Sequence, residues 1–360
     1  MMKKNIKNVK IYGAGSIGNH MANAARFLGA GVDVIDVDPL ALERMKNDIY
    51  PSRYGSWDEE IGLYEKGFCP VRSYDLIVIG TPPDTHLDLA IEACDSSPKA
   101  ILIEKPLCAL DMRGLRKLRE KAKKNNIRLF VGYDHVVGKA SQFLGSCLKS
   151  DLVGEVLTLD VEFREHWGGI FEAHPWLSSP LDSYLGHSKL GGGASGEHSH
   201  ALNFWQHISH LVGGGRIAEV DALFDFGGVQ ALPYDRACFM NLSCASGLIG
   251  RCVQDVITSP AKKWAMVQGT KGRLEWHCSY EPNADKVTVY RGSTKAEEKI
   301  FKKTRPDDFI MELNHINDIM GSHDRLSPID IQFGIQTMDV LLAAHKSYEM
   351  GRRTTVSYFE

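Results

Sequence analysis

Three glycines near the start of the chain constrain its fold more than any other feature. Gly13, Gly15 and Gly18 follow a short apolar run at residues 9–12 and open a predicted helix over 16–28. Between a strand and a helix, G-x-G-x-x-G is typical of a dinucleotide-binding turn. The first glycine permits the tight turn, the second lets the backbone approach a pyrophosphate, and the third lets helix and strand pack closely. The alternative is a glycine-rich turn without a ligand.

The helix N-terminus after this turn supplies unpaired N–H groups and a partial positive charge to phosphates. The residues that we expect to bind the cofactor here are Gly13, Ala14, Gly15, Ser16, Ile17 and Gly18.

Asp36 ends the second predicted strand, eighteen residues after Gly18. An acidic residue at this place binds the ribose hydroxyls of NAD, and its charge repels the 2′-phosphate of NADP. The next residue is Val37 rather than an arginine, so we expect NAD to be preferred over NADP. The alternative is that Asp36 is only a surface acid, with Asp38 or neither residue in the binding role.

Strands and helices alternate over the first 130 residues, which predicts a doubly wound parallel sheet. Beyond Gly132, residues 156–163, 220–226 and 242–253 alternate apolar and polar side chains, as in an antiparallel sheet with one covered face. We therefore expect an α/β protein with two domains, residues 1–133 and 134–360. The first contains predicted strands at 9–12, 32–35, 76–79, 101–103 and 129–131, and a helix to 124 capped by Asp111; the second contains predicted helices at 195–211, 310–320 and 331–350.

Composition excludes several classes of protein. The 360 residues carry a net charge of −3, which gives no basic surplus for nucleic acid. The longest apolar runs, such as residues 76–79, are far shorter than the ~18 residues that span a membrane. Eight scattered cysteines without C-x-x-C argue against structural zinc and a disulfide framework. We expect a cytoplasmic protein with no membrane or nucleic-acid partner.

Two further motifs carry a family resemblance. Gly80-Thr81-Pro82-Pro83-Asp84-Thr85-His86 follows the predicted strand at 76–79, and Glu104-Lys105-Pro106 follows the one at 101–103. With the glycine turn, and with residues 154–156, 269–272 and 344–351, they resemble the Gfo/Idh/MocA oxidoreductases, which include glucose–fructose oxidoreductase and inositol dehydrogenase. The resemblance covers nearly the whole chain.

This resemblance implies a Rossmann domain followed by an α/β domain whose largely antiparallel, open sheet commonly forms the oligomer interface. A homodimer or homotetramer is therefore expected, with a sugar or polyol as substrate. The resemblance also implies which residues line the nicotinamide half of the cofactor: Thr81, Pro82, His86, Glu104 and Lys105.

Lys105 is the strongest catalytic candidate. At the carboxyl end of a strand it would be partly desolvated, and its ammonium could donate to a substrate hydroxyl and help to pass on a proton. Glu104 is expected to hold it as a charge partner. The alternatives are a surface Glu-Lys pair and, for His86, a capping or packing histidine.

His200 is the second catalytic candidate. In the resembling family a G-G-G stretch leads into a helix that bears an aspartate and, four residues later, a catalytic histidine; here Gly196 takes the aspartate's position. Glu197 is a possible substitute, because residues three apart share a helix face. The alternatives are a core histidine and a glutamate that only serves the helix dipole. His198 and His200 could share a metal from an extended strand, but a helix splays them apart, so no metal is expected.

The remaining substrate candidates are polar groups and aromatic rings, which suit a sugar face. Asp134 replaces the family's frequent asparagine, and no matching arginine follows it. The expected substrate residues are Lys105, Arg164, Trp176, His200 and Asn203, several of which have a structural alternative.

Together these features predict an NAD-dependent dehydrogenase that acts on a secondary alcohol of a sugar, inositol or sugar derivative. Two alternatives need the same Rossmann residues. One is an NAD-assisted glycoside hydrolase or lyase that oxidises its substrate transiently; the other is a non-catalytic NAD-binding regulator.

Overall fold

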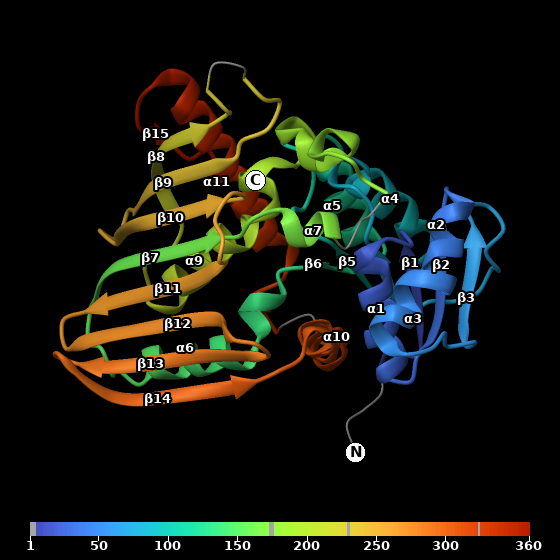
Figure 1. Ribbon diagram of the computed structural model, residues 1–360, viewed down its shortest axis with the longest axis horizontal. Coiled ribbons are helices and arrows are strands. Elements are labelled where there is room, and N and C mark those ends of the chain that lie inside the picture. Colours follow the sequence, from blue (N-terminus) through green and yellow to red (C-terminus); the bar gives the residue numbers. More distant parts are fainter. Residues whose placement is uncertain (1–4, 173–175, 229–230, 323–324) are drawn as a thin grey trace. The chain divides into compact units, whose positions relative to one another are not determined.

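The computed structural model describes residues 5–172, 176–228, 231–322 and 325–360. The chain forms two compact units (Figure 1). Unit 1 comprises Met1–Asp134 and Arg305–Ile331, and unit 2 comprises His135–Thr304 and Gln332–Glu360. The segment Arg305–Ile331 thus belongs with unit 1, whereas the sequence placed all of 134–360 in one domain.

Unit 1 is built on a six-stranded parallel sheet with the order β3-β2-β1-β4-β5-β6. Strands β4 and β5 are buried at every residue, as continuous apolar runs require when helices cover both faces. The predicted doubly wound fold is confirmed. Its strands are β1 (Asn8–Tyr12), β2 (Gly31–Asp36), β3 (Ile61–Glu65), β4 (Leu76–Ile79), β5 (Ala100–Ile103) and β6 (Arg128–Val131).

The helices of unit 1 follow the alternating pattern, with one local difference. The helix predicted to be capped by Asp111 begins at Leu115 behind Gly114, while the Asp111 carboxylate accepts from the Arg113 N–H in the preceding turn. The helices are α1 (Ser16–Phe27), α2 (Pro39–Arg44), the π-helix η1 (Met45–Ile49), α3 (Tyr50–Tyr54), α4 (His86–Ala93), α5 (Leu115–Lys124) and α10 (Arg305–Ile319), with 3-10 turns η2 (Pro83–Thr85) and η3 (Cys94–Ser96).

The C-terminal part of helix α10 and the residues after it are tied to unit 1 by polar contacts near the amino ends of the strands. The Arg128 guanidinium, at the start of β6, donates to the carbonyls of Ile319 and Ser322 and pairs with Asp330 at 2.8 Å. The Asn317 side chain accepts from the backbone N–H of Asn5 at 2.9 Å. These contacts join positions about 200 and 310 residues apart, so no local sequence pattern predicts them.

Unit 2 contains a nine-stranded sheet with the order β14-β13-β12-β11-β7-β10-β9-β8-β15. Among the described strands of this sheet, β7 and β10 alone pair in parallel, so the prediction of a largely antiparallel sheet is confirmed. The stretch 242–253 is a hairpin of two strands. The strands are β7 (Val156–Arg164), β8 (Ile217–Asp225), β9 (Ala237–Cys244), β10 (Ile249–Asp255), β11 (Lys262–Gly269), β12 (Gly272–Glu281), β13 (Ala284–Arg291), β14 (Thr294–Lys302) and β15 (Thr354–Thr355).

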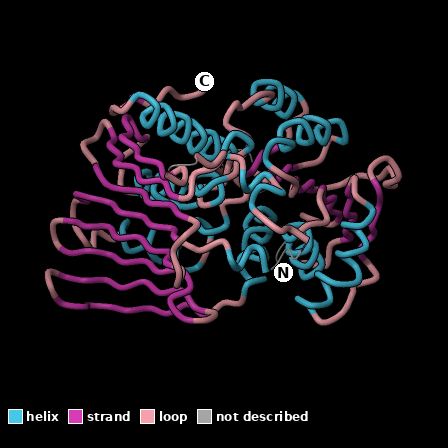
Figure 2. Tube along the Cα trace, turned by 45° about the horizontal axis from the view of Figure 1, so that its top comes forward, coloured by secondary structure: helices cyan, strands magenta, loops and turns pink. Residues whose placement is uncertain are grey.

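Helices α6 and α9 pack against this sheet (Figure 2). The helix predicted over 195–211 is in fact two helices, because His198 leaves helical geometry with φ −97° and ψ 23°. The helical elements of unit 2 are α6 (Lys139–Lys149), α7 (Gly168–Glu172), α8 (Gly193–Glu197), α9 (Ser199–Leu211) and α11 (Ile331–Met350), with 3-10 turns η5 (Pro180–Asp182), η6 (Tyr184–Gly186) and η7 (Ser188–Leu190); the 3-10 turn η4 (Asp134–Val137) lies where unit 1 passes into unit 2. Among the described residues, no helix combines the length and apolar character that a membrane crossing requires.

Candidate active site

The glycine turn between β1 and α1 has the geometry that a pyrophosphate requires. Gly13 has a φ of +102°, and a Cβ there would lie 2.7 Å from the carbonyl oxygen of Gly80. A Cβ on Gly18 would lie 1.9 Å from the Gly13 carbonyl oxygen, so this glycine permits the contact between turn and helix. Above Gly15, by contrast, a Cβ would meet nothing within 4 Å. Gly13 and Gly18 thus lie in tight contact with neighbouring backbone, whereas the space beside Gly15 is open, so that a ligand can approach the backbone there.

The first turn of α1 is suited to an anion. Its N-cap residue, Gly15, makes no side-chain cap hydrogen bond, and the first turn carries no acidic residue. Ser16 and Ile17 are partly exposed. A phosphate here would receive backbone N–H donors and the helix dipole without meeting an acidic residue of the helix's own first turn.

Asp36 lies against the glycine turn. Its Oδ2 accepts from the Ala14 N–H at 2.7 Å, and its Oδ1 accepts from the Asp38 N–H at 2.9 Å. Asp38 instead caps α2 by accepting from the Leu40 N–H, and it pairs with Arg44 at 3.0 Å. Of the two acids, Asp36 is therefore the one that the backbone orients beside the turn.

The loop after β4 borders the same turn, because Gly80 packs against Gly13. The Thr81 hydroxyl hydrogen-bonds with that of Thr85 at 2.7 Å, and Pro82 is exposed. Thr81 and Pro82 thus lie at the carboxyl end of β4, where ligands of open α/β sheets bind.

His86 is fully buried and joins two loops. Its Nε2 lies 2.7 Å from the carbonyl oxygen of Thr81, and its Nδ1 lies 3.1 Å from that of Pro106. Burial lowers the pKa of the imidazole. The ring is enclosed, so it could affect a bound cofactor only through the loops that it connects.

Glu104 and Lys105 follow β5 and differ in exposure. Lys105 is half-buried, whereas the Glu104 side chain is 5% exposed. Burial raises the pKa of Glu104 to about 8, and the charge of Asp134 adds to the increase, while the Lys105 ammonium opposes it. The expected charge partnership of these two residues is therefore weaker than the sequence suggests, because the carboxyl group is largely protonated at neutral pH.

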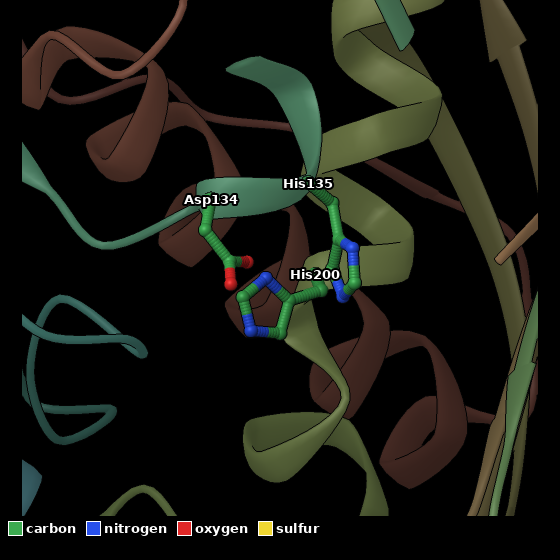
Figure 3. A group of neighbouring side chains, drawn as sticks. All are labelled: Asp134, His135 and His200. Atoms are coloured by element: carbon green, nitrogen blue, oxygen red, sulfur yellow. The ribbon is translucent and has the colours of Figure 1, made fainter. Parts of the chain in front are cut away.

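In unit 2, His200 on α9 lies beside His135 on η4, with ring centroids 4.8 Å apart and the rings nearly perpendicular. Phe163 of β7 contacts both, with centroids 5.1 Å from His135 and 6.4 Å from His200. Figure 3 shows the two histidines with Asp134, the residue before His135; one donor atom of each lies within 4.8 Å of the others. His135 was not predicted, although its place just after β6 could have marked it.

The helix break at His198 alters the expected pairing within the histidine-rich stretch. Glu197 ends α8, whereas His200 is the second residue of α9, so the two do not share one helix face. The structure also explains the missing aspartate: a Cβ on Gly196 would lie 2.0 Å from the Gly191 carbonyl oxygen. The backbone segments lie so close together at this position that a side chain would clash.

Asp235, which sequence reasoning missed, fixes the start of α8. This fully buried carboxylate accepts from the Ser188 hydroxyl at 2.6 Å and from the Ser195 N–H at 2.7 Å. Its isolated position between β8 and β9 gave no motif to recognise.

The other three predicted substrate residues differ in their surroundings. Arg164 pairs with the buried Asp255 at 2.5 Å. Asn203 is buried and donates to the Thr337 hydroxyl of α11 at 3.2 Å. Trp176 is 40% exposed.

Comparison with known proteins identifies the family of the N-terminal part. Residues 7–133 match the GFO_IDH_MocA model, described as "Oxidoreductase family, NAD-binding Rossmann fold". A search of curated proteins finds no match. The resemblance expected from the motifs is confirmed.

Several solved structures share the fold over almost the whole chain. A levoglucosan dehydrogenase in complex with NADH and levoglucosan is 16% identical, with a TM-score of 0.77 over 98% of this chain and 100% of its own. An NAD-binding oxidoreductase from Klebsiella pneumoniae is 18% identical, with a TM-score of 0.75 over 99% and 100%. The WlbA dehydrogenase from Bordetella pertussis, in complex with NADH and UDP-GlcNAcA, is 18% identical, with a TM-score of 0.73 over all of both chains.

Proposed function

We propose that this chain belongs to the Gfo/Idh/MocA oxidoreductases and is an NAD-dependent dehydrogenase that oxidises or reduces a secondary alcohol of a sugar, inositol or sugar derivative. The observation that carries the proposal is the geometry of the glycine turn. Gly13 and Gly18 contact neighbouring backbone tightly, the space beside Gly15 is open, and the Asp36 carboxylate lies next to the turn. Similar structures hold NADH with levoglucosan or with UDP-GlcNAcA, which supports a sugar-like substrate.

NAD is the proposed cofactor in preference to NADP. The Asp36 carboxylate, held by the Ala14 and Asp38 N–H groups, is oriented to accept from ribose hydroxyls and to repel a 2′-phosphate. Calorimetric titration should show tighter binding of NADH than of NADPH, and Asp36→Ala should reduce that preference at least tenfold. Asp38→Ala, which removes the α2 cap and the ion pair with Arg44, is the matched control and should leave the preference unchanged. Equal affinity of the wild type for both cofactors would refute the assignment of Asp36.

The cofactor supplies hydride chemistry at its nicotinamide ring when bound. In the oxidation direction we assign His200 as the base that takes the hydroxyl proton, with His135 beside it at 4.8 Å to hold the imidazole. Lys105, half-buried at the carboxyl end of β5, directs its ammonium toward the developing oxyanion. Thr81, Pro82 and, through the loops it joins, His86 shape the nicotinamide side of the cofactor site.

Replacing Lys105 or His200 by alanine tests these roles. Proton-transfer groups contribute roughly 10²–10⁴-fold to a rate, so each variant should lose at least a hundredfold in turnover with an accepted polyol while retaining NADH affinity. Lys124→Ala, on the exposed end of α5, is the control for loss of one lysine. A loss below tenfold in both variants would refute the assignment.

A homodimer or homotetramer formed through the nine-stranded sheet is also proposed. Leu223, Phe239 and Ile249 are 71%, 41% and 52% exposed on neighbouring strands, and Leu223 pairs directly with Phe239. Large apolar side chains on one sheet face are typical of an interface. Sedimentation should give at least a dimer, which Leu223→Asp together with Phe239→Asp should dissociate. A monomeric wild type would contradict the proposal.

A further inference from the structure

Two buried carboxyl groups lie in unit 1 without a role in the mechanism above. Glu104 follows β5 and is 5% exposed, and Glu312 lies in the middle of α10 and is 1% exposed. In each, the Oε1 atom is buried and has no hydrogen-bond partner. Buried carboxyl oxygens normally have partners, so this pair requires an explanation.

The Glu104 side chain is fixed by the backbone around it. Its Oε2 accepts from the Lys105 N–H at a long 3.4 Å. Its carboxyl group lies over Gly132, where an added Cβ would come within 2.8 Å of Oε1. A glycine at the end of β6 therefore leaves room for an acid that points inward, while the next residue in the chain, Lys105, remains half-buried.

Helix α10 brings further acids toward this position. Burial raises the pKa of Glu312 well above its usual range, and the negative charges of Glu104, Asp134 and Asp308 raise it further. The charged groups acting on Glu104 are Lys105 in its own loop, Asp134 at the start of η4 and Arg305 at the start of α10. Ionising both of these buried acids would be costly, because each has an Oε1 atom without a hydrogen-bond partner and their negative charges repel. The pair therefore retains at least one proton at neutral pH.

We propose that Glu104 balances the charge of the cofactor: it releases a proton when the cationic oxidised nicotinamide is bound and takes one up when the ring is reduced, while Glu312 stays protonated. The inference rests on the proposed function, which puts the nicotinamide beside Lys105. A group with a pKa of about 8 is suited to such exchange at neutral pH, because small changes in local charge alter its protonation.

The proton balance closes without an external reactant other than the substrate and NAD. In the oxidation, the carbinol C–H bond breaks and its electron pair goes with hydrogen to the nicotinamide; the O–H bond breaks and a C=O bond forms. One proton is released overall. His200 takes the hydroxyl proton and returns it to solvent, while Lys105 passes an ammonium proton to the Glu104 carboxylate and takes one from solvent. His200 and Lys105 therefore end unchanged, and Glu104 ends as a neutral acid. Glu104 thus stores the proton that Lys105 passes on, and the protonated Glu312 adds no second negative charge beside it.

Proton release on cofactor binding tests the inference without any substrate. NAD⁺ and NADH are each titrated calorimetrically into the full-length protein at pH 7.5 in two buffers of different ionisation heat. A nearby positive charge lowers a carboxyl pKa by one unit or more, which corresponds to release of about half a proton per site for NAD⁺ but not for NADH. The difference should disappear below about pH 6, where Glu104 would be protonated in both complexes.

Two isosteric variants complete the test. Glu104→Gln should abolish the difference between NAD⁺ and NADH, whereas Glu312→Gln, which imitates a protonated Glu312, should retain it. A wild type that binds both cofactors with equal proton release would overturn the inference but not the proposed function. Failure to bind either cofactor would overturn both. The inference would also be overturned if Glu104→Gln still released more protons on binding NAD⁺ than on binding NADH. If Glu104→Gln fails to fold, the loss of this difference below about pH 6 in the wild type is the deciding measurement.

Discussion

The buried Glu104 carboxyl group makes a specific prediction about stability. Its pKa rises from 4.5 to about 8 on folding, chiefly because burial disfavours the charged form. Below pH 4.5 the carboxyl group is protonated in both the folded and the unfolded protein, so it does not change the free energy of unfolding. Between pH 4.5 and 8 the unfolded chain gives up the proton and the folded protein does not, so the free energy of unfolding falls. Above pH 8 both states are ionised and the loss levels off.

The size of this effect follows from the linkage relation. Each unit of pKa difference corresponds to 1.36 kcal/mol, so between pH 5 and pH 8.5 the wild type should lose about 4 kcal/mol relative to Glu104→Gln. Any constant cost of burying a glutamine amide cancels, because it is the same at both pH values. Glu104→Gln should therefore gain stability over the wild type as the pH rises.

Hydrogen exchange followed by mass spectrometry measures this difference in unit 1 directly. Peptides that cover β1 and β4 lie in the buried core of the parallel sheet, so their slowest amides report the opening of this unit. Wild type and variant are compared at the same pH, which removes the intrinsic pH dependence of exchange. Glu120→Gln, on the exposed side of α5, controls for loss of a glutamate. A difference between Glu104→Gln and wild type that is equal at pH 5 and pH 8.5 would refute the reasoning.

Two further predictions concern the loops around the proposed cofactor site. Gly13 has a φ of +102° and lies against the Gly80 carbonyl, so Gly13→Ala should destabilise unit 1 by about 2 kcal/mol and abolish NADH binding. A Cβ on Gly15 meets no atom within 4 Å, so Gly15→Ala should keep the wild-type melting temperature but weaken the affinity for NADH at least tenfold. His86→Ala removes the partner of the Thr81 and Pro106 carbonyls and should cost about 2 kcal/mol and lower turnover. Calorimetry measures the NADH affinities and thermal melting measures the stabilities. The first prediction would be contradicted by wild-type NADH affinity in Gly13→Ala, and the second by wild-type stability in His86→Ala.

The fold of unit 1 could be predicted because its signals are local. The glycine turn, the short apolar strands and Asp36 at the end of β2 each identify a structure within a few residues of themselves. Helix α11 was also predicted, at residues 331–350, with the observed bounds. The return of Arg305–Ile331 to unit 1 could not be predicted, since it depends on Arg128 and Asn317 reaching partners far away in the chain.

The histidine-rich stretch was predicted less well, because a helical pattern does not show where a helix breaks. A continuous helix would put Glu197 and His200 on one face, but the turn at His198 separates them, and the ring nearest to His200 among its aromatic contacts is His135. The close approach of Gly196 to the Gly191 carbonyl likewise cannot be seen from the sequence, because it depends on the folded backbone. What the sequence does show is that an aspartate is missing there.

Glu312 is different, because a local signal for it existed. Phe309, Leu313 and Ile316 occupy positions i, i+4 and i+7 of α10, the apolar stripe that faces a core, and Glu312 lies at i+3 on the same stripe. A glutamate on such a stripe must either pair with a cation or hold a proton, since an isolated buried carboxylate is too costly. The structure shows its Oε1 buried without a partner, which leaves protonation. Acids at core positions of amphipathic helices are therefore worth testing as titrating groups before a structure is known.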